Sequence, residues 1–129
     1  MTKQISKIMI KKKSGKIINI SSIFGMVGKS GRSLYSVTKF GLIGLTKSTA
    51  LDLARYNILV NSVSPGVINT GLTKKILNSK EAKKIKKEIP LNKLGEATDV
   101  SNLVCFLCSN LNSYITGQNF IIDGGYTSK

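Results

Sequence analysis

Hydrophobic residues form three short, almost continuous runs along the chain, at Lys16–Ser21, Asn57–Ser64 and Asn119–Asp123. Each run has the length of a β-strand rather than that of a helix. Strands of a parallel sheet that is covered on both faces are apolar at nearly every position, whereas half-exposed strands alternate between apolar and polar residues. The pattern therefore predicts three buried parallel strands.

Between these runs, apolar residues recur at helical spacing in three longer segments. Ser33 to Tyr56 is broadly apolar, which suits a helix that packs on the sheet and also on a second surface. Asn57 follows it at the C-cap position, where a left-handed backbone is favoured. A second, lysine-rich helix is predicted from about Thr73 to Glu88. A third helix, from about Ala97 to Leu111, is expected to direct its apolar positions toward a core: Val100, Leu103, Val104, Phe106, Leu107 and Leu111.

Tyr35 and Lys39 are four residues apart in the first of these segments and therefore share one helix face. A free phenol has a pKa of about 10, and a neighbouring ammonium group favours the phenolate and lowers that pKa toward the working range. Ser22 falls at the carboxyl end of the first predicted strand, where open parallel sheets bind ligands. These three side chains can hold a substrate carbonyl and protonate its oxygen while a nicotinamide delivers hydride.

The second predicted strand ends at Pro65-Gly66, and several short motifs complete a recognisable pattern. They are Ile18-Asn-Ile-Ser-Ser22, Tyr35-x-x-x-Lys39, Val60-Asn-x-Val-x-Pro-Gly66 with Ile68 and Thr70, Leu94-Gly-Glu96, Tyr114-Ile-Thr-Gly-Gln118 and Asp123-Gly-Gly125. With these motifs, the chain resembles the C-terminal half of a short-chain dehydrogenase/reductase. It is most similar to the bacterial 3-oxoacyl-[acyl-carrier-protein] reductases. The resemblance extends from about Ser14 to the C-terminus.

The resemblance implies a role for each residue of the catalytic group. Tyr35 would be the general acid/base, and Ser22 would orient the substrate carbonyl. Lys39 would lower the pKa of Tyr35 and also bind the nicotinamide ribose. The implied reaction is the reduction of a 3-oxoacyl thioester, carried by an acyl carrier protein, in fatty acid biosynthesis.

The resemblance also implies the cofactor site and the assembly. The turn at Pro65 and Gly66 would lie against the nicotinamide of NADP or NAD, with NADPH favoured. The Ile68 backbone and the Thr70 hydroxyl would contact its amide and phosphates, and Tyr35 and Lys39 would complete the site. A homo-oligomer, in this family a homotetramer, would form through the Tyr-bearing helix and the last strand.

The implied fold is the C-terminal half of a Rossmann-like doubly wound parallel sheet, in a single partial domain over residues 1–129. Met1 to Lys13 matches the end of the helix that precedes the catalytic-serine strand. The family's Thr-Gly-x-x-x-Gly-x-Gly turn, which places a helix N-terminus at the pyrophosphate, would precede Met1. We therefore expect a truncated product or one piece of a split enzyme, with a separately encoded N-terminal half as a partner, an exposed strand edge and marginal stability.

Two other functions remain open from the sequence. One is a different dehydrogenase of the family, acting on a sugar or a small alcohol. The other is a remnant without catalysis that serves as an assembly piece. Dinucleotide titration separates them, because a remnant that lacks the glycine-rich turn should not bind the cofactor.

Two further motifs suggest chemistry that the sequence does not support. The glycines of Gly25-Met-Val-Gly-Lys-Ser-Gly31 are three apart, unlike a dinucleotide fingerprint, and we interpret this stretch as the loop between serine and tyrosine. Cys105 and Cys108 have C-x-x-C spacing, but the chain has no histidine and no other cysteine to complete a zinc site. We therefore predict no metal, and two buried, reduced thiols.

The chain is strongly basic, because its 20 basic and 6 acidic residues give a net charge of +14. Of the basic residues, 18 are lysine. The lysines are scattered and lack interleaved aromatic residues, so A/T-rich codon bias explains them better than nucleic-acid binding does. Lys11-Lys-Lys13 and Arg55 lie where the resemblance places a docking surface for an acidic carrier protein. Without a membrane-length apolar run or a signal-peptide core, the expected location is the cytoplasm, with no membrane partner.

Overall fold

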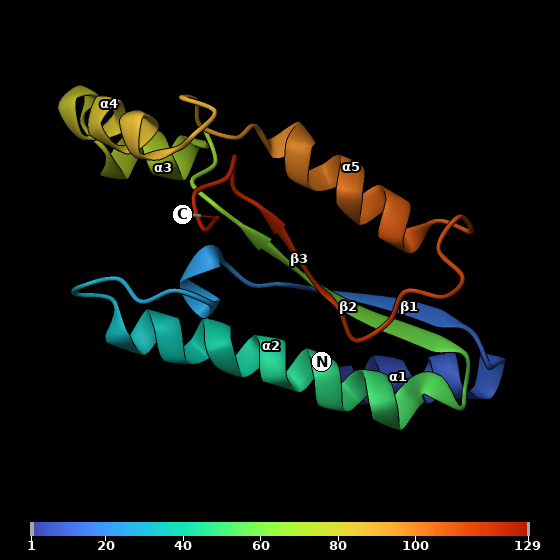
Figure 1. Ribbon diagram of the computed structural model, residues 1–129. Helices are drawn as coiled ribbons and strands as arrows, with labels where there is room; N and C mark the ends of the chain where they lie inside the picture. The colour runs from blue at the N-terminus through green and yellow to red at the C-terminus, as the bar shows by residue number, and fades with distance from the viewer. Residues whose placement is uncertain (1, 129) are drawn as a thin grey trace.

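The computed structural model describes residues 2–128, which form a three-stranded parallel sheet between two layers of helices (Figure 1). Its elements, in chain order, are α1 (Thr2–Lys12), β1 (Gly15–Ile20), the 3₁₀ turn η1 (Ile23–Gly25), α2 (Ser33–Ala54), β2 (Ile58–Pro65), α3 (Gly71–Ile76), α4 (Ser79–Glu88), α5 (Ala97–Cys108) and β3 (Asn119–Ile122). The three strands agree with the predicted runs to within one residue at each end. Met1, the first residue of the predicted N-terminal helix, lies outside the described residues.

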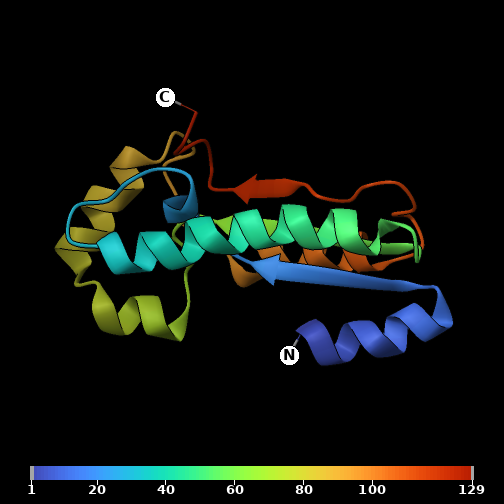
Figure 2. The same ribbon diagram turned by 90° about the horizontal axis from the view of Figure 1, so that it is seen from below.

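The strands follow the order β1-β2-β3, with Gly15 opposite Ile58 and Ser62 opposite Asn119. Helix α2, which connects β1 to β2, covers one face of the sheet, and α5, on the connection from β2 to β3, covers the other (Figure 2). Both connections step in the same direction across the sheet. Because their helices lie on opposite faces, the two crossovers have opposite hands, although parallel crossovers are almost always right-handed.

The apolar core lies between the sheet and the C-terminal half of α2. Ala50 and Leu53 of α2 pack with Ile58 and Val60 of β2, and Met9, Ile10, Ile17 and Tyr56 close the cluster at its edge. Asn57 adopts φ 57°, as predicted, and this left-handed residue turns the chain from α2 into β2. The C-cap itself is Arg55, two residues earlier than expected.

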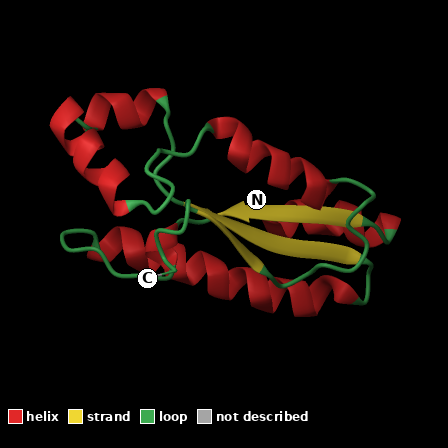
Figure 3. Cartoon of the chain, turned by 45° about the horizontal axis from the view of Figure 1, so that its top comes forward, coloured by secondary structure: helices red, strands yellow, loops and turns green. Residues whose placement is uncertain are grey.

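The prediction of one helix from Thr73 to Glu88 was wrong, because the chain forms two short helices there. The Asn78 side chain accepts a hydrogen bond from the Glu81 amide, and the Glu81 carboxylate accepts one from the Asn78 amide, both at 2.9 Å. This capping box starts a new helix at Ser79. Figure 3 shows α3 and α4 as two separate helices beyond the carboxyl ends of the strands.

Helix α5 buries less of its apolar surface than predicted. It ends at Cys108 rather than at Leu111, and Leu107 is its one buried residue. Phe106 and Leu111 are 39% and 80% exposed, so their assignment to the core was wrong. The prediction of buried thiols was also wrong: Cys105 and Cys108 are both exposed and unbridged.

Several surfaces that would be covered in a larger sheet are open. β1 is an edge strand, and Ile20 at its end is 46% exposed. On α2, Leu34, Val37 and Leu51 are between 68% and 83% exposed. Among the described residues, no helix combines the length and the hydrophobicity needed to cross a bilayer.

Candidate active site

Tyr35 lies in the first helical turns of α2, and Lys39 lies one turn further along the same face. The Lys39 ammonium is 5.6 Å from the centre of the Tyr35 ring. It also donates a hydrogen bond of 3.0 Å to the backbone carbonyl of Ile20, the last residue of β1. Tyr35 is 40% exposed, so its phenol is open to a ligand. Lys39 therefore joins the phenol-bearing turn of α2 to the carboxyl end of β1.

Ser22 is buried and lies two residues after Ile20, the last residue of β1. Its hydroxyl oxygen accepts a hydrogen bond of 3.2 Å from the Phe24 amide and caps η1. Among the hydrogen bonds of the described residues, none joins the Ser22 and Tyr35 hydroxyls. The structure thus brings both residues to the carboxyl end of β1, and Lys39 is the link between that end and α2.

Ser21 and Gly25 hold this end of β1 against α2, and the sequence motifs assigned neither of them a role. The Ser21 hydroxyl donates a hydrogen bond of 2.9 Å to the Lys39 carbonyl, and its amide donates one of 2.7 Å to Val63 of the neighbouring strand. A Cβ on Gly25 would lie 2.8 Å from the carbonyl carbon and oxygen of Lys39. The glycine at position 25 could have predicted this contact from the sequence, because a glycine in a connecting segment often marks a close approach of two backbones.

The turn at Pro65 and Gly66 ends β2 beside the end of β3. The Gly66 amide donates a hydrogen bond of 2.8 Å to the Ile122 carbonyl. A Cβ on Gly66 would lie 2.9 Å from Cα and Cβ of Asp123, so this position requires glycine for packing. Packing against Asp123 therefore explains the glycine at position 66 without reference to a cofactor.

Ile68 and Thr70 lie on the segment that leads from β2 to α3. Ile68 forms a parallel bridge with Gly95, in which the Gly95 amide donates to Val67 and the Asn69 amide donates to Gly95. In such a bridge, the N–H of the central residue points away from the partner segment, so the Ile68 amide is directed away from Gly95. The exposed Thr70 hydroxyl caps α3 by accepting a hydrogen bond of 3.2 Å from the Thr73 amide.

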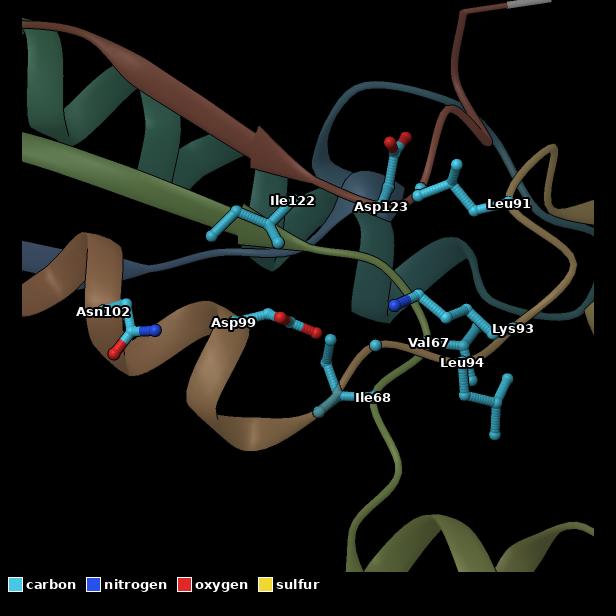
Figure 4. Close-up of a pocket in the computed structure, with 11 residues that line it drawn as sticks. Val67, Ile68, Leu91, Lys93, Leu94, Asp99, Asn102, Ile122 and Asp123 are labelled. Atoms are coloured by element: carbon cyan, nitrogen blue, oxygen red, sulfur yellow. The ribbon is translucent and has the colours of Figure 1, made fainter.

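A cavity of about 370 Å³ opens beyond the ends of β2 and β3 (Figure 4). Ile68, Leu94 and Ile122 give it apolar walls, and Lys93 and Asp99 give it charged ones. Figure 4 shows these residues converging from β3, the segment after β2, α5 and the loop before α5. The arrangement provides a partly apolar recess on the same end of the sheet as Ser22 and the first turn of α2.

The other candidate chemistry is located elsewhere. Within residues 2–128, no group of three or more His, Cys, Asp and Glu side chains is placed to hold a metal ion. Lys11–Lys13 precede β1 and Arg55 precedes β2, so both lie at the amino end of the sheet. Arg55 stacks on the Tyr56 ring at 4.8 Å. The basic residues that were expected to dock a carrier protein are therefore at the opposite end of the sheet from Ser22.

Comparison with known proteins identifies the family of this chain. A family model described as "Enoyl-(Acyl carrier protein) reductase" matches residues 1–127. The chain belongs to the short-chain dehydrogenase/reductase family. It is 47% identical over 125 residues to the 3-oxoacyl-[acyl-carrier-protein] reductase FabG of Aquifex aeolicus and 46% identical to that of Buchnera aphidicola subsp. Schizaphis graminum. These matches cover 97% of the chain but 50% and 51% of the relatives, so the chain spans about half their length.

Solved structures of family members confirm the fold. The structure of ElxO with NADP bound has a TM-score of 0.93 at 41% identity, covering 99% of this chain and 52% of that one. The structure of 4-hydroxyisoleucine dehydrogenase complexed with NADH has a TM-score of 0.94 at 38% identity, covering 99% and 54%. A gluconate 5-dehydrogenase from Burkholderia cenocepacia J2315, in complex with NADP and tartrate, has a TM-score of 0.94 at 29% identity, covering 99% and 51%. The predicted partial Rossmann-like sheet is therefore confirmed.

Proposed function

We propose that this chain carries the catalytic half of an NAD(P)H-dependent reductase that acts on a 3-oxoacyl thioester of an acyl carrier protein. Tyr35 protonates the carbonyl oxygen, Ser22 holds that oxygen, and Lys39 orients and supports Tyr35. The observation that carries the proposal is the position of Lys39, whose ammonium is 3.0 Å from the Ile20 carbonyl and 5.6 Å from the Tyr35 ring centre. This position supports a shared site for Tyr35, the proposed acid, and for Ser22, which lies two residues after Ile20.

The residues present fit the nicotinamide end of a dinucleotide. Lys39 supplies a cation, the Ile68 amide is directed away from its bridge partner, and the exposed Thr70 hydroxyl lies at the start of α3. Pro65 and Gly66 would form the wall against which the ring rests. When bound, the nicotinamide supplies the hydride, and these residues orient it toward a carbonyl held at Ser22. The NADP-bound and NADH-bound neighbours support either dinucleotide, and we propose NADPH as the one used.

Turnover and dinucleotide binding test the proposal together. The chain is assayed for oxidation of NADPH and of NADH by an acetoacetyl thioester, alone and mixed with the N-terminal half of the Aquifex aeolicus relative. We expect turnover at least in the mixture, and a loss of 10²-fold or more in Tyr35→Phe with dinucleotide binding retained. Tyr114→Phe is the matched control, because Tyr114 is 96% exposed in the loop between α5 and β3.

Different outcomes favour the other two functions. A mixture that reduces NADP with a sugar acid such as gluconate or with a small alcohol, but does not oxidise NADPH with the thioester, indicates another dehydrogenase, as the similarity to a gluconate 5-dehydrogenase allows. A chain that neither binds dinucleotide nor gains activity in the mixture is a remnant without catalysis.

We also propose that the working protein is a cytoplasmic homo-oligomer, such as a homotetramer, assembled with its N-terminal half. The exposed apolar side chains of α2, at Leu34, Val37 and Leu51, support burial of that helix against another copy. Light scattering of the chain alone and of the mixture measures the assembly. Persistent monomers in both samples would contradict this part of the proposal.

A further inference from the structure

A second cavity, of about 500 Å³, lies between α3, α4 and residues 93–96. Its apolar wall is formed by Leu77, Ala82 and Leu94. Lys74 reaches it from the last turn of α3 and Lys86 from the last turn of α4, while Lys93 stands on the wall that it shares with the cavity of Figure 4. The cavity thus combines an apolar wall with lysines from three separate segments.

The charge of this cavity is unbalanced toward the positive. Among the described residues that line it, Glu96 carries the one carboxylate. Both oxygens of that carboxylate accept from the Asn69 amide group, at 3.0 and 3.3 Å. The lining therefore has three lysines and a single carboxylate that already has a partner, and this imbalance attracts an anion.

The cavity lies next to the proposed cofactor contacts, since Thr73, which lines it, is hydrogen-bonded to the Ile68 carbonyl and to the Thr70 hydroxyl. None of the residues proposed to contact the nicotinamide lines it. Helices α3 and α4, which line it, lie beyond the carboxyl ends of the strands (Figure 1). Lys93 and Leu94 line both this cavity and the smaller one, so the two adjoin. Within one copy, Lys11–Lys13 and Arg55 lie at the amino end of the sheet and do not line this cavity.

We propose that this cavity binds the phosphate group on the arm of a thioester substrate, with Lys74 and Lys86 as the principal ligands. A phosphate offers several strong acceptor oxygens, so lysines from different helices can bind it at once. The pantetheine arm that presents a thioester carries one such phosphate next to an uncharged chain, which matches the cavity's charged and apolar walls. The identity of the arm rests on the proposed function, whereas binding of a phosphate does not.

The two helices also contain ideal controls. Lys75 and Lys87 are in the same last turns as Lys74 and Lys86, but they do not line the cavity. Lysines in a last helical turn also interact favourably with the helix dipole, and each pair has one such lysine in α3 and one in α4. A double substitution of Lys74 and Lys86 to Gln and one of Lys75 and Lys87 to Gln remove the same charge from the same helices.

The experiment is a titration of the full chain with 4′-phosphopantetheine and, separately, with pantetheine at constant ionic strength. Calorimetry or the amide chemical shifts measure the binding. We expect the phosphorylated compound to bind at least tenfold more tightly than pantetheine. K74Q/K86Q should reduce its affinity about tenfold or more, and K75Q/K87Q should reduce it less than twofold. Because all four lysines are exposed, the variants should retain the wild-type amide spectrum.

Three results would overturn the assignment. Equal losses in the two double variants would show nonspecific attraction to a chain of net charge +14. Equal affinities for pantetheine and its phosphate would show that the phosphate is not recognised. NADP that competes with 4′-phosphopantetheine, and loses affinity in K74Q/K86Q, would assign the lysines to the cofactor. Since no arm of the experiment requires turnover, its failure leaves the reductase proposal standing, and an inactive chain does not affect it.

Discussion

The Ser21 hydroxyl donates a hydrogen bond of 2.9 Å to the backbone carbonyl of Lys39, and this bond ties the end of β1 to α2. A second bond joins the same two segments, because the Lys39 ammonium donates to the carbonyl of Ile20, the residue before Ser21. The two bonds fix the distance between the end of β1, which Ser21 and Ser22 follow, and the helix turn that carries Tyr35. The geometry of the proposed catalytic group thus depends on Ser21, a residue that has no role of its own in that group.

Removal of the Ser21 hydroxyl should destabilise the chain more than removal of a comparable hydroxyl nearby. Ser21→Ala loses a buried hydrogen bond and should lower the free energy of unfolding by about 1 kcal/mol. Ser36→Ala is the control, because the buried Ser36 hydroxyl has no hydrogen-bond partner among the described residues. Urea denaturation followed by circular dichroism measures both variants. Equal destabilisation would show that the Ser21 bond contributes nothing specific.

Gly25→Ala should be more damaging, because the added methyl group meets backbone rather than a flexible side chain. Its Cβ would lie 2.8 Å from the carbonyl carbon and oxygen of Lys39 and 2.9 Å from the Ser21 hydroxyl. Overpacking of this kind costs about 1 to 3 kcal/mol and would push η1 away from α2. Gly28→Ala is the matched control in the same loop, since no atom lies within 4 Å of its Cβ position. Identical thermal unfolding of the two variants would show that the close contact between Gly25 and the Lys39 carbonyl does not constrain the fold.

The strands and the Tyr35 to Lys39 turn could be predicted because local pattern determines them. Buried strands are apolar in runs, and two residues four apart in a helix must share a face. The break between α3 and α4 was also readable, since Asn78 and Glu81 have the spacing of a capping box, but the lysine-rich periodicity on both sides obscured it.

The bond between Ser21 and Lys39 was not predictable, because it joins residues 18 positions apart through a backbone carbonyl that no sequence motif marks. Exposure was equally hidden. Cys105 and Phe106 occupy apolar positions in α5, yet whether an apolar helix face is buried depends on what the rest of the fold places against it.

The exposure of Cys105 and Cys108 predicts ready reaction with a thiol reagent. Both thiols should react with a disulfide reagent such as Ellman's in the native chain, without denaturant, and release two equivalents of chromophore. Cys105→Ser and Cys108→Ser should each release one. If the thiols react only after denaturant is added, α5 is covered in solution, either by another copy or by the N-terminal half.

Stability should fall in acid because of Asp123, at the end of β3. Burial raises the pKa of its carboxyl group, but hydrogen bonds from the Thr127 hydroxyl and from the amides of Thr127, Gly125 and Tyr126 outweigh burial, so its pKa lies below the ordinary 3.8. The carboxylate thus stabilises the fold fully above pH 3.8, and this contribution is lost as the pH falls through the folded-state pKa.

The pH dependence can be assigned to Asp123 by comparing variants. Asp123→Asn should be less stable than the wild type at pH 6, and the difference in the free energy of unfolding should shrink as the pH falls below about 4. Thr127→Val, which removes the 2.7 Å hydrogen bond to the carboxylate, should show the same trend with a smaller amplitude. Urea denaturation at intervals from pH 6 to pH 2.5 measures it. If the difference in the free energy of unfolding between wild type and Asp123→Asn stays constant over this range, ionisation of the Asp123 carboxyl group does not stabilise the fold.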